Sequence, residues 1–143
     1  FVWFCKLNPK VLPADIKKMM DKNIENLHFP GYISSEELRE AYSGADLYVF
    51  LTHEETEGIV LLEALATKAR TLIRDIEIFK KDYHDGVNIY KGKNLDEFES
   101  KIRGILDGDL KDLAERAYEI AEAKSIKNTG LRLMECYERV LSL

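Results

Sequence analysis

Short apolar runs alternate with longer amphipathic stretches along this 143-residue chain. The clearest apolar run covers residues 47–51, Leu-Tyr-Val-Phe-Leu, which is short, aromatic and β-branched and is therefore typical of a buried strand. Similar runs predict strands at residues 1–4, 27–29, 71–74 and 87–90. Five strands separated by helices indicate an α/β fold, a Rossmann-like parallel sheet with right-handed crossovers and helices on both faces.

Helices are expected where apolar residues recur at intervals of three or four positions. Pro13 opens the first helix and Asn23 ends it. Ser34 or Ser35 begins the second helix, with Glu37 completing a capping box. The remaining helices are expected over residues 59–66, 76–83, 95–107, 110–123 and 126–141.

Residues 52–67, THEETEGIVLLEALAT, join the central strand to its helix and carry an unusual charge pattern. The helical part, residues 59–66, is apolar except for Glu63, so we expect this helix to be buried on every side. A buried carboxylate needs polar partners, because an isolated buried charge costs several kcal/mol. Glu63 is therefore expected to be enclosed and to bind either a ligand or a buried Arg or Lys from a neighbouring element.

The start of this helix is expected to bind an anion. In a parallel α/β sheet, ligands lie beyond the carboxyl ends of the strands. The helix offers unpaired N–H groups and a positive dipole end there, which favour phosphate, and Gly58 has no side chain to keep a ligand away. Glu63 lies about one and a half turns further along, within reach of hydroxyls attached to that phosphate. Because Glu55 lies before the helix, the two carboxylates bracket the anchor and indicate a nucleotide-sugar site.

The length of the chain predicts a single domain. Its amino-acid composition, 45% hydrophobic and 33% charged, is ordinary for a globular protein. The net charge of -5 argues against a nucleic-acid partner. No apolar run approaches the roughly 18 residues of a membrane span, and residues 1–5 lack the charged lead-in of a signal peptide, so a cytoplasmic location is expected. Cys5 and Cys136 share no ligand spacing, which predicts two reduced thiols and no metal site.

Glu55 and Glu63, seven residues apart within ADLYVFLTHEETEGIVLLEALA, resemble the E-x7-E signature of retaining glycosyltransferases with the GT-B fold, the group 1 family. The segments NLHFPGYISSEELREAYSGAD and DIEIFKKDYHDGVNIYKGKNLDEFESKIRGIL also resemble this family, so nearly the whole chain is covered. HFPGY with EETEGIVLLEALA is most similar to bacterial diacylglycerol glucosyltransferases, which make membrane glucolipids. The resemblance implies that residues 1–143 are the donor-binding, C-terminal half of a GT-B fold. It also implies a fragment that lacks the N-terminal acceptor domain and the first part of the C-terminal domain.

The same resemblance implies roles for single residues. Glu55, the catalytic glutamate of the motif, would contact and orient hydroxyls of the donor sugar, and Glu63 would bind the ribose. The rest of the donor-binding set comprises backbone groups of Gly58, Ile59 and Val60 at the diphosphate, Tyr32 and Ile33 at the base, and the loop residues Thr56 and Glu57. Thr56 and Glu57 stand where the family commonly has Gly and Phe, and the family's diphosphate-neutralising Arg and Lys would precede the start of this chain.

The function implied is transfer of glucose or another hexose from a nucleotide sugar, UDP-glucose by expectation, to a lipid acceptor such as diacylglycerol. The nucleotide sugar is a substrate, so no cofactor is expected. The missing N-terminal domain would bind the acceptor, and the full-length enzyme would contact the inner membrane face peripherally. Two alternatives stay open: a transferase that builds capsule or another polysaccharide, and a non-catalytic nucleotide-binding or interaction module.

Each site residue also has a simpler interpretation. Glu55 could be a solvated loop carboxylate, and Glu57 could only complement the helix dipole. His53 beside the motif could touch the sugar or be an oriented loop histidine. Arg70 and Arg74, expected near the carboxyl ends of the strands, could reach an anion.

Overall fold

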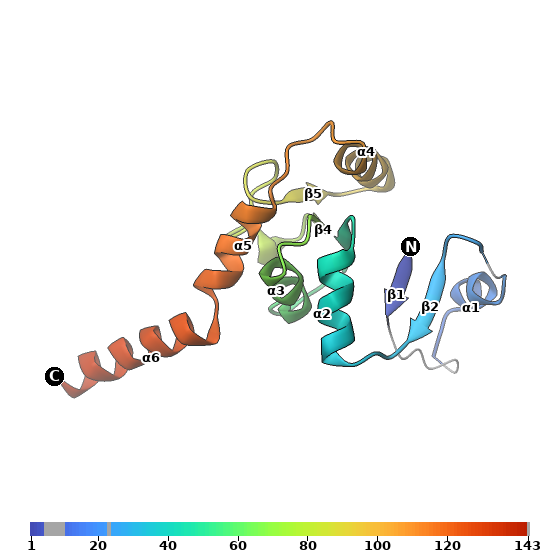
Figure 1. Cartoon of the computed structure of the whole chain (residues 1–143). Helices are drawn as coiled ribbons and strands as arrows, with labels where there is room; N and C mark the ends of the chain where they lie inside the picture. The colour runs from blue at the N-terminus through green and yellow to red at the C-terminus, as the bar shows by residue number, and fades with distance from the viewer. Residues whose placement is uncertain (5–10, 23, 143) are drawn as a thin grey trace. The chain divides into compact units, whose positions relative to one another are not determined.

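A computed structural model of the chain describes residues 1–4, 11–22 and 24–142, shown in Figure 1. The expected helix end at Asn23 and the thiol of Cys5 lie outside the described residues. The chain divides into two compact units, Phe1–Leu38 and Arg39–Leu143. Each unit contains its own parallel sheet.

The first unit has a short parallel strand pair joined through a helix. Strand β1 (Val2–Phe4) pairs with β2 (His28–Gly31), and α1 (Ala14–Asp21) lies between them in sequence. Both predicted strands are confirmed, and α1 begins directly after Pro13, as expected for a residue with a fixed φ and no N–H. None of the described residues in this unit is buried.

Helix α2 (Ser35–Gly44) follows and has the predicted capping box. The Ser34 N–H donates to Glu37 Oε2 at 2.8 Å, and the Glu37 N–H donates to Ser34 Oγ at 3.2 Å. These two bonds satisfy backbone donors that the first turn of a helix leaves free. They also lower the pKa of Glu37, because the Ser34 N–H stabilises the ionised carboxylate.

The second unit contains a three-stranded parallel sheet in the order β3-β4-β5. Its strands are β3 (Tyr48–Phe50), β4 (Thr71–Arg74) and β5 (Tyr90–Gly92). Helix α3 (Ile59–Ala66) connects β3 to β4, and three further helices follow β5: α4 (Leu95–Leu106), α5 (Ala114–Ala123) and α6 (Ile126–Leu141). Helix α6 has no buried residue and extends away from the body of the unit (Figure 1).

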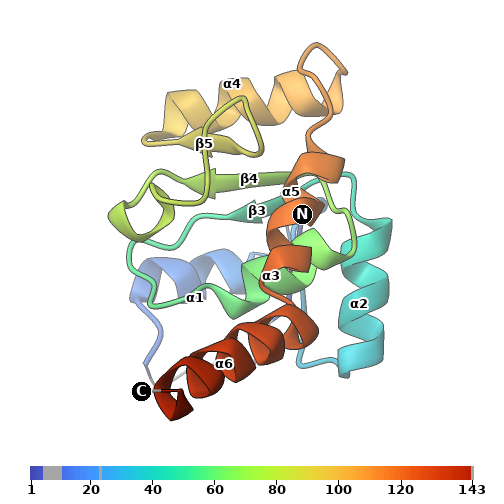
Figure 2. The same ribbon diagram turned by 90° about the vertical axis from the view of Figure 1, so that its left-hand side faces the viewer.

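Apolar clusters cover both faces of this sheet, because side chains alternate between the two faces along a strand. Ile73 of β4 is fully buried on one face in a cluster with α3 and α5, and these two helices lie in front of the strands in Figure 2. Its neighbour Leu72 is fully buried on the other face with Phe98 and Ile105 of α4. The predicted α/β, Rossmann-like architecture with helices on both faces of a parallel sheet is therefore confirmed.

Three boundaries differ from the sequence-based predictions, and tertiary contacts explain two of them. The helix expected at residues 76–83 is only the short 3-10 turn η1 (Glu77–Phe79), and the strand expected at 87–90 begins at Tyr90. Asp75, just before η1, holds the chain in place. Its N–H donates to the Gly92 carbonyl, and its carboxylate pairs with Lys91. The helix expected from residue 110 begins at Ala114. The preceding turn is held by tertiary bonds, from the residue 110 N–H to the residue 104 carbonyl and from the Tyr90 hydroxyl to the residue 111 carbonyl.

Candidate functional site

The loop between β3 and α3 lies at the carboxyl end of a parallel strand, where the anion-binding turn is predicted. Gly58 is the N-cap of α3 and adopts the left-handed conformation, with φ of 73° and ψ of 46°. No side chain caps this helix, and the first intrahelical bond is donated by the Leu61 N–H to the Gly58 carbonyl at 3.0 Å, so the N–H groups of Ile59 and Val60 have no intrahelical acceptor. The side chains of Ile59 and Val60 are 62% and 41% exposed. The start of α3 therefore presents backbone donors at an accessible surface.

The Glu55 carboxylate folds back onto its own loop. Its Oε1 accepts the Thr56 N–H at 2.8 Å. The pKa of Glu55 is lowered, first by this bond and then by the N–H groups of Glu57 and Gly58. Glu55 thus stays ionised and already occupies part of the group of backbone donors that was expected to be free for a phosphate.

Glu63 is exposed, so the expectation that α3 is buried on every side is wrong. Only Leu61, Ala64 and Leu65 are buried, which gives α3 one covered side and one open side. Glu63 takes part in none of the ion pairs among the described residues, so the alternative of a partner Lys or Arg is not observed there. The burial argument for a Glu63 ligand is therefore lost. What is left is the position of Glu63 on the same helix as the anion-binding turn.

Two tyrosines lie near Glu63 and pack against each other. Tyr42 of α2 and Tyr48 of β3 make an edge-to-face pair with ring centroids 5.2 Å apart. Burial raises the pKa of each hydroxyl, and the negative charge of Glu63 raises both further. The negative charge of Glu55 also raises the pKa of Tyr48. Both phenols therefore stay neutral at physiological pH and lie within electrostatic range of the motif carboxylates.

The two arginines do not supply a free cation at this turn. Arg74 lies at the carboxyl end of β4, but its Nε donates to the Leu51 carbonyl at 3.0 Å and its Nη1 donates to the Lys93 carbonyl at 3.2 Å. Its guanidinium also stacks 4.9 Å from the Phe98 ring centroid. Arg70 precedes β4 and therefore lies at the amino end of the sheet, which corrects its predicted position. Arg74 thus links the end of β3 to the end of β5 through its Nε and Nη1 donors.

The other predicted site residues are distributed over both units. Thr56 and Glu57 are exposed on the loop, as is His53. Tyr32 is 81% exposed and Ile33 is half-buried, and both belong to the first unit. Among the described residues, no group of three or more His, Cys, Asp or Glu side chains is arranged to hold a metal ion.

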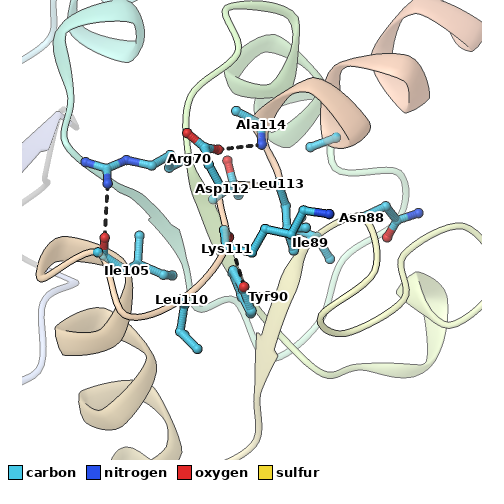
Figure 3. Close-up of a pocket in the computed structure, with 13 residues that line it drawn as sticks. Arg70, Asn88, Ile89, Tyr90, Ile105, Leu110, Lys111, Asp112, Leu113 and Ala114 are labelled. Carbon is cyan, nitrogen blue, oxygen red and sulfur yellow. Dashed lines mark hydrogen bonds between the residues drawn. The ribbon is translucent and has the colours of Figure 1, made fainter.

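A separate cavity of about 310 Å³ lies at the opposite, amino end of the sheet. Figure 3 shows that its polar groups bond to the protein itself: Arg70 Nη1 donates to the Ile105 carbonyl at 3.0 Å, and the Ala114 N–H donates to Asp112 Oδ1 at 2.8 Å. The Tyr90 hydroxyl likewise donates to the Lys111 carbonyl at 2.9 Å. These bonds hold the turn before α5 in place. The cavity is remote in the fold from the α3 turn and shares no residue with it.

One residue that packs against the turn has no signal in the local sequence pattern. Phe79, in η1 after β4, is 1% exposed. A Cβ atom added to Gly58 would lie 3.3 Å from its Cε1. Its contact with a turn twenty-one positions earlier depends on the strand order, so local periodicity could not indicate it.

The parallel sheet with helices on both faces and a glycine turn between β3 and α3 define a Rossmann-like α/β domain. The sequence matches the family described as Glycosyl transferases group 1 over residues 15–124, which is well over half of the chain. The chain belongs to this family.

Two relatives have names that refer to diacylglycerol or to a glycosylated diacylglycerol. The chain is 34% identical over 143 residues to the processive diacylglycerol alpha-glucosyltransferase of Acholeplasma laidlawii, covering 100% of this chain and 43% of that enzyme. It is 29% identical over 132 residues to the alpha-galactosylglucosyldiacylglycerol synthase of Streptococcus pneumoniae, covering 89% of this chain and 34% of that protein. The chain thus spans less than half the length of the curated relatives it matches.

A solved structure supports the same architecture. The sucrose-phosphate synthase of Thermosynechococcus elongatus superposes with a TM-score of 0.81 at 17% identity, over 99% of this chain and 38% of that one. The chain therefore has the fold of one half of a GT-B glycosyltransferase. Among the described residues, no helix combines the length and the apolar character needed to span a bilayer.

Proposed function

We propose that this chain is the donor-binding half of a retaining glycosyltransferase that moves glucose from UDP-glucose to a lipid acceptor such as diacylglycerol. The observation that carries the proposal is the strand–turn–helix unit at residues 48–66, in which the half-buried Glu55 precedes the Gly58 turn and the exposed Glu63 follows it. The similarity to the Acholeplasma laidlawii glucosyltransferase supports the sugar and the acceptor class.

In this proposal the diphosphate binds the first-turn N–H groups of α3. Negative charge grows on the diphosphate as its bond to the sugar breaks, so fixed N–H donors stabilise the transition state more than the ground state. Ile59 and Val60 contribute these donors through their backbone, and Gly58 allows the left-handed conformation of the turn. A side chain at Gly58 would point at the buried Phe79 ring, so the expectation that its absence keeps the way open for a ligand is not met.

The two motif carboxylates bind hydroxyl groups on either side of the diphosphate. Glu63 accepts hydrogen bonds from the ribose, and Glu55 accepts them from the sugar and fixes its orientation. Correct orientation alone supplies several kcal/mol towards the barrier. The acceptor and any general base come from the rest of the enzyme.

The net negative charge of the β3–α3 loop disfavours binding of the donor diphosphate by these residues alone. Glu54, Glu55 and Glu57 place three carboxylates on the loop, and Arg74 is engaged by backbone carbonyls. A doubly charged diphosphate is therefore repelled unless cations from elsewhere in the protein neutralise it. We expect the 143-residue chain to bind the donor weakly and to transfer no sugar alone.

Calorimetry with UDP and GDP on the wild type and Glu63→Ala tests the proposal. A hydrogen bond to a charged group contributes about 1.5–3 kcal/mol, so Glu63→Ala should weaken UDP binding about tenfold or more. Glu119→Ala is the matched control, because it removes one exposed carboxylate from α5, away from the turn. Equal UDP affinity in all three proteins would contradict the ribose role, and no binding of either nucleotide to the wild type would contradict the function.

A further inference from the structure

The Gly58 turn rests on an aromatic ring that a distant part of the chain supplies. A Cβ atom at Gly58 would meet Phe79 Cε1 at 3.3 Å and Cζ at 3.4 Å, and it would lie 3.7 Å from Glu55 Cγ. The turn backbone is therefore in contact with the Phe79 ring, with the Glu55 side chain close to the same point. Phe79 is 1% exposed, so this contact is closed to water.

Phe79 cannot easily move away from the turn. Its ring lies 6.2 Å from Phe50 and 5.3 Å from Tyr83 between centroids, within the cluster under α3 and α5. Its N–H donates to the Ile76 carbonyl at 3.1 Å, so η1 is fixed to the end of β4. Close packing of this kind holds a side chain in one rotamer.

The start of this segment is anchored by a buried ion pair. Lys91 Nζ lies 2.5 Å from Asp75 Oδ1, and the lysine side chain is only 7% exposed. The Asp75 N–H donates to the Gly92 carbonyl at 2.9 Å. The segment that carries Phe79 is thus bound to β5 on one side, while its ring contacts the β3–α3 turn on the other.

We infer that Phe79 is a positioning residue for the 55–58 loop: its ring sets the path of the Gly58 turn and thereby the placement of the Glu55 carboxylate and the N–H groups at the start of α3. This inference rests on the proposed function for its consequence in donor binding. The placement of Glu55 itself is independent of any ligand.

The variant Phe79→Leu removes part of the ring and leaves an apolar side chain. Without the ring the turn widens, and the Glu55 carboxylate loses its N–H partners. Carbon-detected NMR titration of the Glu55 carboxyl should then give a higher pKa than in the wild type, where the Thr56 N–H lowers it. Affinity for UDP-glucose, measured by calorimetry, should fall about tenfold. Phe79→Met, which refills most of the volume, should recover part of both effects.

Ile105→Ala is the control for general destabilisation. Ile105 is buried in the cluster on the other face of the sheet, so its truncation lowers stability without reaching the turn. The inference is overturned if Phe79→Leu leaves the Glu55 titration unchanged, or if Ile105→Ala shifts it as much at equal loss of stability. If the wild type binds no UDP-glucose while Phe79→Leu still shifts the Glu55 titration, the proposed function fails and the positioning of Glu55 by Phe79 stands.

Discussion

At the scale of single residues, the Glu55 carboxylate accepts a backbone N–H of its own loop. The Thr56 N–H donates to it at 2.8 Å, and the start of α3 lies directly beyond. Under the proposed function, a diphosphate at the start of α3 would compete with this internal carboxylate for backbone donors. The carboxylate would then be released to contact the sugar.

Glu55→Gln should separate these two effects. Removing one negative charge about 4 Å from a phosphate is equivalent to roughly 1 kcal/mol in water, so UDP should bind about fivefold more tightly. UDP-glucose should gain less, because its hydroxyls lose a charged acceptor. Calorimetry with both ligands measures the difference, and a fall in UDP affinity would contradict competition by Glu55.

Tyr83 carries the one buried side-chain polar atom without a hydrogen-bond partner among the described residues. Burial raises its pKa to about 12, because ionisation inside the cluster is unfavourable. Tyr83→Phe should therefore raise the free energy of unfolding by about 1 kcal/mol, measured by urea denaturation, since an orphaned hydroxyl is removed.

The pH dependence of stability tests the burial of the Tyr83 hydroxyl independently. Above the ordinary tyrosine pKa of about 10 the unfolded chain ionises first, so the wild type loses stability as pH rises from about 10 to 12. Tyr83→Phe should lose less over that interval. Equal losses in both proteins would show that the hydroxyl is solvated in the native state.

At the scale of elements, the connection from β4 to β5 depends on the ion pair of Asp75 with the buried Lys91. The lysine hydrogen bond lowers the pKa of Asp75, and the charge of Lys91 lowers it further. Asp75→Asn leaves a buried ammonium without its carboxylate and should cost about 2–3 kcal/mol, less than for a fully enclosed pair because Asp75 is 21% exposed. Urea denaturation at pH 6 measures this difference.

The same pair predicts a pH dependence of defined sign. Because the folded pKa of Asp75 is lowered, its stabilisation is present above the ordinary aspartate pKa of about 3.9 and is lost as the pH falls through the folded value. The difference between wild type and Asp75→Asn should therefore shrink below about pH 4. Glu99→Gln, which breaks an exposed pair with Arg103, should change stability by less than about 0.5 kcal/mol and serves as the control.

At the scale of the whole molecule, the two units differ in how much structure they bury. Strand β4 is the central strand of its sheet, and Thr71, Leu72 and Ile73 are buried. The first unit has a two-stranded sheet and no buried residue among those described. Its local opening should therefore require less free energy.

Hydrogen exchange should report this difference directly. Amide protons of β1 and β2 should exchange at least about tenfold faster than those of β4, because opening a small, exposed sheet breaks few packed contacts. Mass spectrometry of peptides from residues 1–38 and 66–80 measures both rates in one sample. Equal protection in the two peptides would mean that the units open together.

Features that depend on neighbouring residues in the chain were predicted well. Ser34 and Glu37 form their capping box, as side-chain chemistry within one turn requires. The apolar runs gave all five strands of the described residues, with β5 displaced, and the spacing of Glu55 and Glu63 placed the motif on a loop and helix.

Features that depend on which helices and strands pack together could not be predicted from local sequence patterns. Glu63 is exposed because α3 is covered on one side only. The sequence of a helix that is apolar all round does not indicate which side other elements will cover. Arg70 lies at the amino end of β4 because of where that strand begins. The sequence by itself determined helix caps, strands and the motif, since these need only short-range bonds and side-chain periodicity. The tertiary structure alone decided burial and the contact of Phe79 with Gly58, since both require segments distant in sequence to pack together.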